Sequence, residues 1–183
     1  MAAPAVKKPV YVEGDIFAAL KGVTATTFVP HVCNDRGAFG AGFVVPLKKH
    51  YPDCHEAYMK WSSGNPPHGH AYPDGDAFRL GGTQIVEVSD SPKIFVCNMV
   101  AQTLGGVRPL YYNMLARCMD AVARSCVKEG GEVRCPLFGA GLAGGDWAFV
   151  EKLVEDCWLR RQVSVTVHYI MESLPPGWTP PSV

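Results

Sequence analysis

Two glycine-rich stretches of the sequence could hold an anionic ligand through backbone N–H groups. Residues 31–42 read HVCNDRGAFGAG, and residues 136–147 read PLFGAGLAGGDW. Each stretch begins in an apolar run typical of a strand and leads into a run with helical spacing. Glycine lets the backbone approach an anion closely, and the free N–H groups at the start of a helix favour negative charge. The two loops therefore predict a site that grips a diphosphate from both sides.

The second stretch also contains a literal G-x-G-x-x-G pattern, from Gly139 to Gly144, which is a signature of dinucleotide-binding Rossmann folds. That fold places the glycine loop after its first strand and an acidic residue about 20 positions further on. Here the loop lies near the end of the chain, and only one helical run and one strand-like run follow it. The pattern therefore favours phosphate binding without a Rossmann fold.

Polar side chains stand beside both loops. Asn34 and Asp35 follow a strand-like run, where short polar side chains either form a turn or hydrogen-bond ribose hydroxyls. Asp15 either caps the next helix or accepts hydrogen bonds from an adenine amino group. Asp146 directly precedes an apolar helical run, where a helix N-cap is the simpler interpretation. His31 is interpreted as a satisfied core histidine, with orientation of the loop as the alternative.

The histidines and cysteines predict no metal site. Residues 68–70 read HGH and follow Cys54 and His55, but this spacing fits no zinc-binding pattern. None of the seven cysteines belongs to a C-x-x-C pair, and Cys33, Cys97 and Cys135 lie within apolar runs, as reduced core thiols do. We therefore expect a reducing, cytoplasmic location, with neither a metal nor an organic cofactor.

Strand-like and helix-like runs alternate along the chain, which predicts an α/β layer fold. Ligands of such folds bind at the carboxyl ends of strands, so function is expected in the loops after Glu13, Cys33, Met99 and Phe138. Asp53 is the expected cap of the second helix. The expected strands cover residues 11–15, 26–34, 83–89, 93–99, 132–138 and 163–170, and the expected helices cover 43–52, 53–61, 109–128 and 147–161, with a loop over 62–80.

Composition sets the class of protein. The chain has 183 residues, of which 48% are hydrophobic and 19% charged, and this suits one globular domain. The 17 basic and 17 acidic residues cancel, so charge gives no support for a nucleic-acid or membrane surface. We expect a single domain over residues 1–183, with a core from about 10 to 170 and a proline-rich tail over 171–183, and with no signal peptide or membrane span.

Four motifs, in this order, resemble the macro domain family. They read VEGDIF, HVCNDRGAFGAGFVVPLKKHYP, VCNMVAQ and PLFGAGLAGGDW, and they extend over nearly the whole chain. The resemblance is greatest to the branch that contains the terminal ADP-ribose protein glycohydrolase and phosphatases of ADP-ribose 1″-phosphate. It implies a three-layer α/β/α sandwich around a mixed central sheet, with an ADP-ribose cleft across the strand ends.

The resemblance also implies which residues bind the ligand. One end of the cleft would hold adenine, the middle the diphosphate, and the other end the distal ribose. By motif, the adenine end would be formed by Asp15, Ile16 and Tyr169 or Ile170, the diphosphate loops by Gly40, Ala41, Gly42, Gly139, Ala140, Gly141, Leu142 and Ala143, and the distal ribose end by Asn34 and Gln102.

The sequence departs from this branch at two catalytic positions. The glycohydrolase uses a lysine after the fourth strand and an aspartate in the second glycine loop, where this chain has the residues Asn-Met-Val of positions 98–100 and Ala143. A covalent route through lysine therefore has no amine at that place. The hypothesis is that Asn34 and Asp35 position the distal ribose and a water molecule, with Asp35 as general base and Asp146 as the second choice.

The predicted function is that of an ADP-ribosyl hydrolase that removes ADP-ribose from acidic side chains of proteins. Two alternatives stay open: a phosphatase of ADP-ribose 1″-phosphate, and a reader that binds ADP-ribose without turnover. The expected partner is ADP-ribose or an ADP-ribosylated protein, and nucleic acid is expected only as an ADP-ribosylated substrate.

Overall fold

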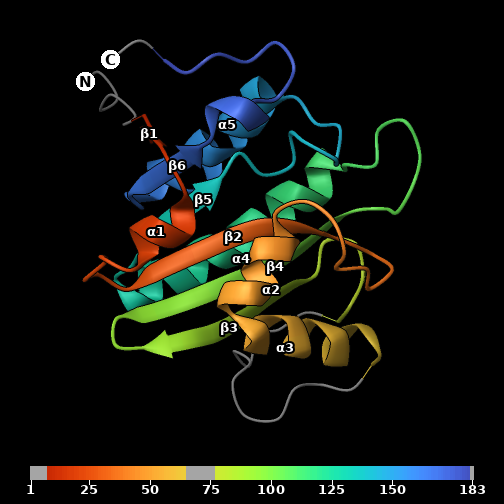
Figure 1. The fold of residues 1–183 in the computed structure, drawn as a ribbon, viewed down its shortest axis with the longest axis horizontal. Coiled ribbons are helices and arrows are strands. Elements are labelled where there is room, and N and C mark those ends of the chain that lie inside the picture. Colours follow the sequence, from red (N-terminus) through yellow and green to blue (C-terminus); the bar gives the residue numbers. More distant parts are fainter. Residues whose placement is uncertain (1–7, 65–76, 182–183) are drawn as a thin grey trace.

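The computed structural model describes residues 8–64 and 77–181, so residues 65–76 of the expected loop over 62–80 lie outside it. Its strands form one sheet in the order β1-β6-β5-β2-β4-β3, in which β3 and β4 are antiparallel and all other neighbours are parallel. The expected mixed sheet is confirmed (Figure 1). The strands are β1 (Val10–Glu13), β2 (Thr27–Asn34), β3 (Thr83–Asp90), β4 (Lys93–Gln102), β5 (Glu132–Pro136) and β6 (Val165–Tyr169).

Helices cover both faces of the sheet and complete the three-layer sandwich (Figure 1). Side chains of β4 alternate between the two faces, because successive residues of a strand point to opposite sides. One set packs with α1 (Ile16–Leu20), α2 (Val44–His50) and α3 (Pro52–Ser62), and the other with α4 (Tyr112–Glu129) and α5 (Trp147–Cys157). The first set comprises Ile94, Val96 and Val100, and the second Phe95, Cys97, Met99 and Ala101.

Several helix boundaries differ from expectation, among them the start of α4, which lies at Tyr112 rather than at residue 109. The cap assigned to Asp53 is wrong, because α3 begins one residue earlier, at Pro52, and Tyr51 occupies the N-cap position without a side-chain bond. Proline suits the first turn of a helix, where its missing N–H has no partner to lose. The last expected helix is shorter, since α5 ends at Cys157 and a 3-10 turn, η1 (Leu159–Arg161), follows.

The cysteines and the C-terminal tail both contribute to packing. All seven cysteines are free thiols, and six of them are buried, including the three in apolar runs, whose interpretation as core residues is confirmed. In the tail, the ring of Trp178 lies 5.5 Å from that of Tyr11 and 5.6 Å from that of Tyr169, so this part of the tail is held against the β1–β6 edge. Within the described ranges, no helix has the length and apolar character needed to cross a bilayer.

Candidate functional site

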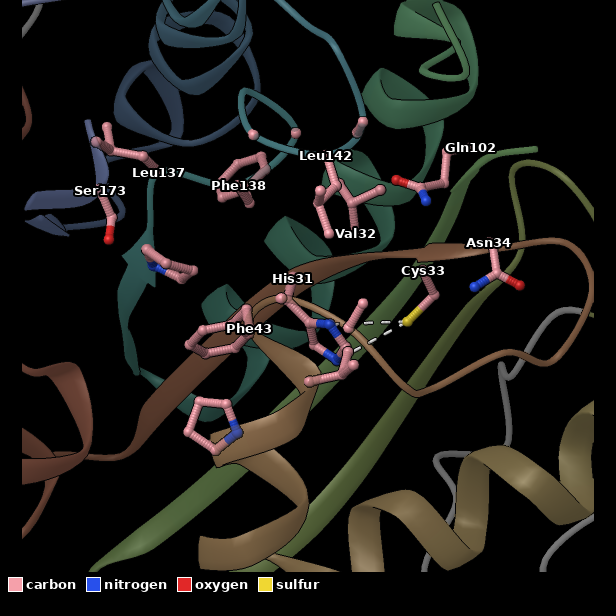
Figure 2. Close-up of a pocket in the computed structure, with 18 of the residues that line it drawn as sticks. His31, Val32, Cys33, Asn34, Phe43, Gln102, Leu137, Phe138, Leu142 and Ser173 are labelled. Atoms are coloured by element: carbon pink, nitrogen blue, oxygen red, sulfur yellow. Dashed lines mark hydrogen bonds between the residues drawn. The ribbon is translucent and has the colours of Figure 1, made fainter. Parts of the chain in front are cut away.

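A cleft of about 940 Å³ opens at the carboxyl ends of the parallel strands, a size that suits a small organic ligand. It is bounded by the loops that follow β1, β2, β4, β5 and β6, which include the four loops expected to carry function. Figure 2 shows Asn34 and Gln102 together at one end of the cleft, with Leu137 and Ser173 at the other. The strand order thus brings residues from distant parts of the chain to one edge of the sheet.

Most residues that the family motifs assigned to a ligand line this cleft. Ala140 does not line it, because it is buried within its loop, and neither Asp35 nor Asp146 is among the lining residues. The predicted ligand residues that do line it are Asp15, Ile16, Asn34, Gly40, Ala41, Gly42, Gln102, Gly139, Gly141, Leu142, Ala143 and Tyr169.

Asp15 stands at the end of the cleft next to α1. Its Oδ1 atom accepts a hydrogen bond from the backbone N–H of Phe17 at 3.0 Å, so the N-cap interpretation is confirmed. Its Oδ2 atom accepts no hydrogen bond from the described residues and remains available to a ligand. The backbone N–H of Gly14 donates to the carbonyl of Tyr169 at 2.9 Å, which fixes Asp15 beside the end of β6. One carboxylate can therefore cap the helix and bind a ligand at once.

An aromatic wall of Phe17, Phe43 and His50 lines the same part of the cleft. The ring of Phe17 stacks on His50 with centroids 4.6 Å apart and on Phe43 with centroids 5.3 Å apart. Stacked rings present a flat apolar surface that suits a planar ligand group. The sequence does not single these residues out, because aromatic residues in helical runs are more typical of core.

His168 is a further cleft residue that carries no recognisable signal in the sequence. It lies on β6, where Val12 of β1 and Pro136 of β5 are its neighbours, and it is 4% exposed. Neither ring nitrogen has a hydrogen-bond partner among the described residues. Burial lowers the pKa of His168, as does the charge of Arg134, while Asp15 acts in the opposite direction. The imidazole is therefore neutral near pH 7.

His31, in the floor of the cleft, has the opposite environment (Figure 2). Its Nε2 atom lies 2.6 Å from Oδ1 of Asn98, whose Nδ2 atom donates to Oε1 of Gln84 at 2.9 Å. Since Asn98 Oδ1 is an acceptor, Nε2 of His31 carries the proton in this arrangement. Burial lowers the pKa of His31 to about 4, so the ring is neutral. The interpretation as a satisfied core histidine is confirmed.

Asn34 uses its side chain within its own turn. Its Oδ1 atom accepts from the backbone N–H groups of Arg36 and Ala38, both at 3.0 Å, and its Nδ2 atom donates to the carbonyl of Ala38 at 2.7 Å. The Tyr58 hydroxyl donates to the Asn34 carbonyl at 2.8 Å. The turn interpretation is thus confirmed, and a catalytic role for Asn34 stays a prediction.

The two aspartates expected to act as bases lie outside the lining of the cleft. Asp35 Oδ1 is 3.8 Å from Nε of Arg36, and the charge of Asp35 adds to the burial that raises the pKa of Tyr58, so this carboxylate lies towards α3. Asp146 caps α5, where its Oδ1 atom accepts from the backbone N–H of Ala148 at 2.9 Å. A role for either carboxylate as general base stays a prediction.

The two glycine loops carry the free backbone N–H groups that the sequence predicted. Within the described chain, none of the N–H groups of residues 40–42 and 139–143 donates a hydrogen bond to the protein. Gly42 and Gly139 have positive φ angles of 73° and 75°, which glycine adopts without strain. A Cβ atom at Gly42 would lie 3.2 Å from Cδ1 of Leu142, so the loops meet across the cleft.

The described residues contain no group of three or more His, Cys, Asp or Glu side chains that could hold a metal ion. The HGH motif at residues 68–70 lies outside the described residues. The expectation that it forms no metal site with Cys54 and His55 therefore stays a prediction.

Comparison with known proteins places this architecture in a family, although no family model matches the sequence. A curated ADP-ribose 1″-phosphate phosphatase of Meyerozyma guilliermondii is 27% identical over 81 residues, which cover 44% of this chain and 41% of the yeast protein. The DarTG structure of Thermosipho africanus in complex with ADP-ribose shares the fold, with a TM-score of 0.69 and 16% identity over 93% of this chain and 44% of that one. A macrodomain protein of Streptomyces coelicolor is 32% identical, with a TM-score of 0.71, over 88% of this chain and 98% of that one. The last similarity shows that this chain belongs to the macrodomain family.

Proposed function

We propose that this macrodomain binds ADP-ribosyl groups in the cleft and hydrolyses the ester bond between ADP-ribose and an acidic side chain at the cleft end formed by Asn34 and Gln102. The observation that carries the proposal is the pair of glycine loops. Their N–H groups have no partner in the part of the chain that the structure describes, and they border one cleft between Asp15 at one end and Gln102 at the other. This arrangement offers a carboxylate to a nucleobase, backbone N–H donors to a diphosphate and side-chain amides to a ribose.

Binding of the diphosphate rests on the backbone. N–H groups fixed in a loop stabilise an anion without a cationic side chain, and they need no rearrangement when the ligand arrives. The loops meet through Leu142 and Gly42, so a diphosphate between them would be held from two sides. The names of the yeast phosphatase and of the DarTG complex support ADP-ribose as the ligand.

Hydrolysis would occur at the anomeric carbon of the distal ribose. The C1″–O bond breaks, the acyl carboxylate leaves with the bonding electrons, and a water oxygen adds to C1″ and releases its proton. Within the described chain, Asp15 is the only carboxylate that lines the cleft, and it stands at the other end. We therefore propose that Gln102 and the turn held by Asn34 orient the water, and that diphosphate oxygens of the substrate stabilise the developing positive charge.

A second function, binding without turnover, is favoured by this same lack of a carboxylate at the Asn34 end. A reader needs the recognition groups at the Asp15 end and the two glycine loops, and it needs no base. The glutamyl ester is the substrate that separates the two functions most clearly, because a carboxylate is a good leaving group that requires no protonation.

The test uses purified protein with three ligands. A peptide carrying ADP-ribose on glutamate should release ADP-ribose, and in ¹⁸O water the freed glutamate should stay unlabelled because attack occurs at C1″. Release of phosphate from ADP-ribose 1″-phosphate, with the peptide untouched, would assign the phosphatase function instead. Binding of ADP-ribose with no turnover of either substrate would assign the reader function. Failure to bind ADP-ribose at about 1 mM would refute all three.

A further inference from the structure

The unpartnered imidazole of His168 is a feature that the proposed function has not used. Buried polar atoms in folded proteins almost always have a hydrogen-bond partner, because an unpaired one costs free energy. Among the described residues, four buried side-chain nitrogen and oxygen atoms lack a partner, and two of them are Nδ1 and Nε2 of His168. Of the residues concerned, His168 is the one that lines the cleft. A ligand in the cleft can therefore supply the hydrogen-bond partner that the described residues do not give to His168.

His168 stands next to Asp15. Gly14 directly precedes Asp15, and Tyr169 directly follows His168. The N–H of Gly14 donates a hydrogen bond to the carbonyl of Tyr169, so the two side chains come from adjoining segments. Both side chains line the cleft, and Asp15 is close enough for its charge to act on the pKa of the imidazole. The two groups thus form a short polar edge in a part of the cleft whose other wall is aromatic.

The hydrogen-bonding pattern of this edge is defined. The free Oδ2 atom of Asp15 can only accept, and a neutral imidazole offers one N–H donor and one acceptor. An acceptor beside a donor matches a ring that carries an amino group beside a ring nitrogen. In adenine the amino group is flanked by N1 and N7, both of which accept. Hypoxanthine and guanine carry a carbonyl oxygen at that position, which would face the Asp15 carboxylate as a second acceptor.

We propose that His168 contributes to base specificity beside Asp15: its ring N–H donates a hydrogen bond to N1 or N7 of adenine, while Asp15 accepts one from the adjacent amino group. The inference rests on the proposed binding of ADP-ribose and adds a residue that reads the base. It also explains why a polar side chain is buried without a partner on β6, since the bond forms only in the complex.

A thermodynamic cycle tests this contact. ADP-ribose and its 1-deaza and 7-deaza analogues are titrated into the wild-type protein and into His168→Leu and His168→Gln. The wild type should bind one of the two deaza analogues about three- to tenfold more weakly than ADP-ribose, the range for a neutral hydrogen bond. His168→Leu should lose a similar factor for ADP-ribose and should no longer discriminate against that analogue. His168→Gln, which keeps a donor, should recover part of the discrimination.

Two controls separate reading of the base from a structural role. His168→Leu replaces an unpaired buried group with an apolar one, so the melting temperature without ligand should stay equal or rise. A lower melting temperature with no change in discrimination would overturn the proposal, as would wild-type protein that binds both deaza analogues as tightly as ADP-ribose. Inosine diphosphate ribose should bind the wild type more weakly by a factor on the order of 100 or more. Wild-type protein that fails to bind ADP-ribose would overturn the proposed function as well, whereas tight binding without coupling to His168 overturns this inference alone.

Discussion

The two ends of the cleft use their polar groups in opposite ways. At the α1 end, one carboxylate oxygen of Asp15 and both ring nitrogens of His168 have no hydrogen-bond partner among the described residues. At the other end, the Asn34 amide makes three hydrogen bonds to its own turn, and Asp35 is not among the residues that line the cleft. The α1 end is thus prepared for recognition, whereas the Asn34 end offers a fixed shape and backbone groups. In the proposed hydrolysis, that end contributes Gln102 and the Asn34 turn to orient the water, and the rest comes from the substrate.

The largest effect is expected from Asn34, because its side chain holds the turn at that end of the cleft. Asn34→Ala removes three hydrogen bonds and should lower the free energy of unfolding by about 3 kcal/mol, at roughly 1 kcal/mol each. Asn34→Asp is the matched control, since it keeps the two bonds accepted from Arg36 and Ala38 and loses the one donated to the Ala38 carbonyl. Urea denaturation measures both variants. An Asn34→Ala protein as stable as wild type would mean that Asn34 is free to serve the ligand.

Acid should destabilise the protein through His31, the partnered counterpart of His168. The folded pKa of His31 is about 4, below the ordinary value of 6.5, so its contribution is fully present above pH 6.5 and is lost as pH falls towards 4. The loss should be about 3 kcal/mol, at about 1.4 kcal/mol for each pH unit. Melting temperatures between pH 7 and 4 test this. His31→Gln should show a flatter profile, and an unchanged profile would contradict the assignment.

Removing the free oxygen of Asp15 should weaken ADP-ribose binding at the α1 end of the cleft without destabilising α1. Asp15→Ser keeps a side chain that can cap α1 but lacks the second oxygen, so ADP-ribose affinity should fall roughly 10- to 100-fold while stability stays near wild type. Asp15→Ala should lose the same affinity and, in addition, about 1 kcal/mol of stability. Calorimetry and denaturation separate the two losses. Wild-type affinity in Asp15→Ser would mean that the carboxylate serves the helix alone.

The smallest effect is expected at Asp146, which caps α5 and is not among the residues that line the cleft. Asp146→Ala should cost about 1 kcal/mol of stability, and Asp146→Ser should restore most of it. Turnover of the glutamyl ester should be unchanged in both variants. A large fall in turnover with intact ADP-ribose binding would return Asp146 to the mechanism.

The sequence predicted the fold and most of the cleft because these features are local. Glycine loops, strand ends and the apolar runs around them are visible in short windows, and their order matched one family. Asp15 and Asp146 could both be recognised as caps for the same reason, since a cap depends on residues within one turn of the helix.

The remaining parts of the site depend on contacts between distant segments. His168 lies in a short apolar run, and its place in the cleft follows from β6 pairing with both β1 and β5. Asp35 was expected in the cleft, but the β2–β4 register shifts between Cys33 and Asn34, which interrupts the alternation of side chains there. No single-sequence pattern reports such a shift.

The most direct test of the account is calorimetric titration of ADP-ribose into the wild-type protein, with Asp15→Ser as the matched variant. We expect a single site with a Kd below about 1 mM, a free energy more favourable than about −4 kcal/mol, and at least tenfold weaker binding by the variant. Absence of binding by the wild-type protein at 1 mM, or equal binding by both proteins, would contradict the central claim that this cleft recognises ADP-ribose through the end next to α1.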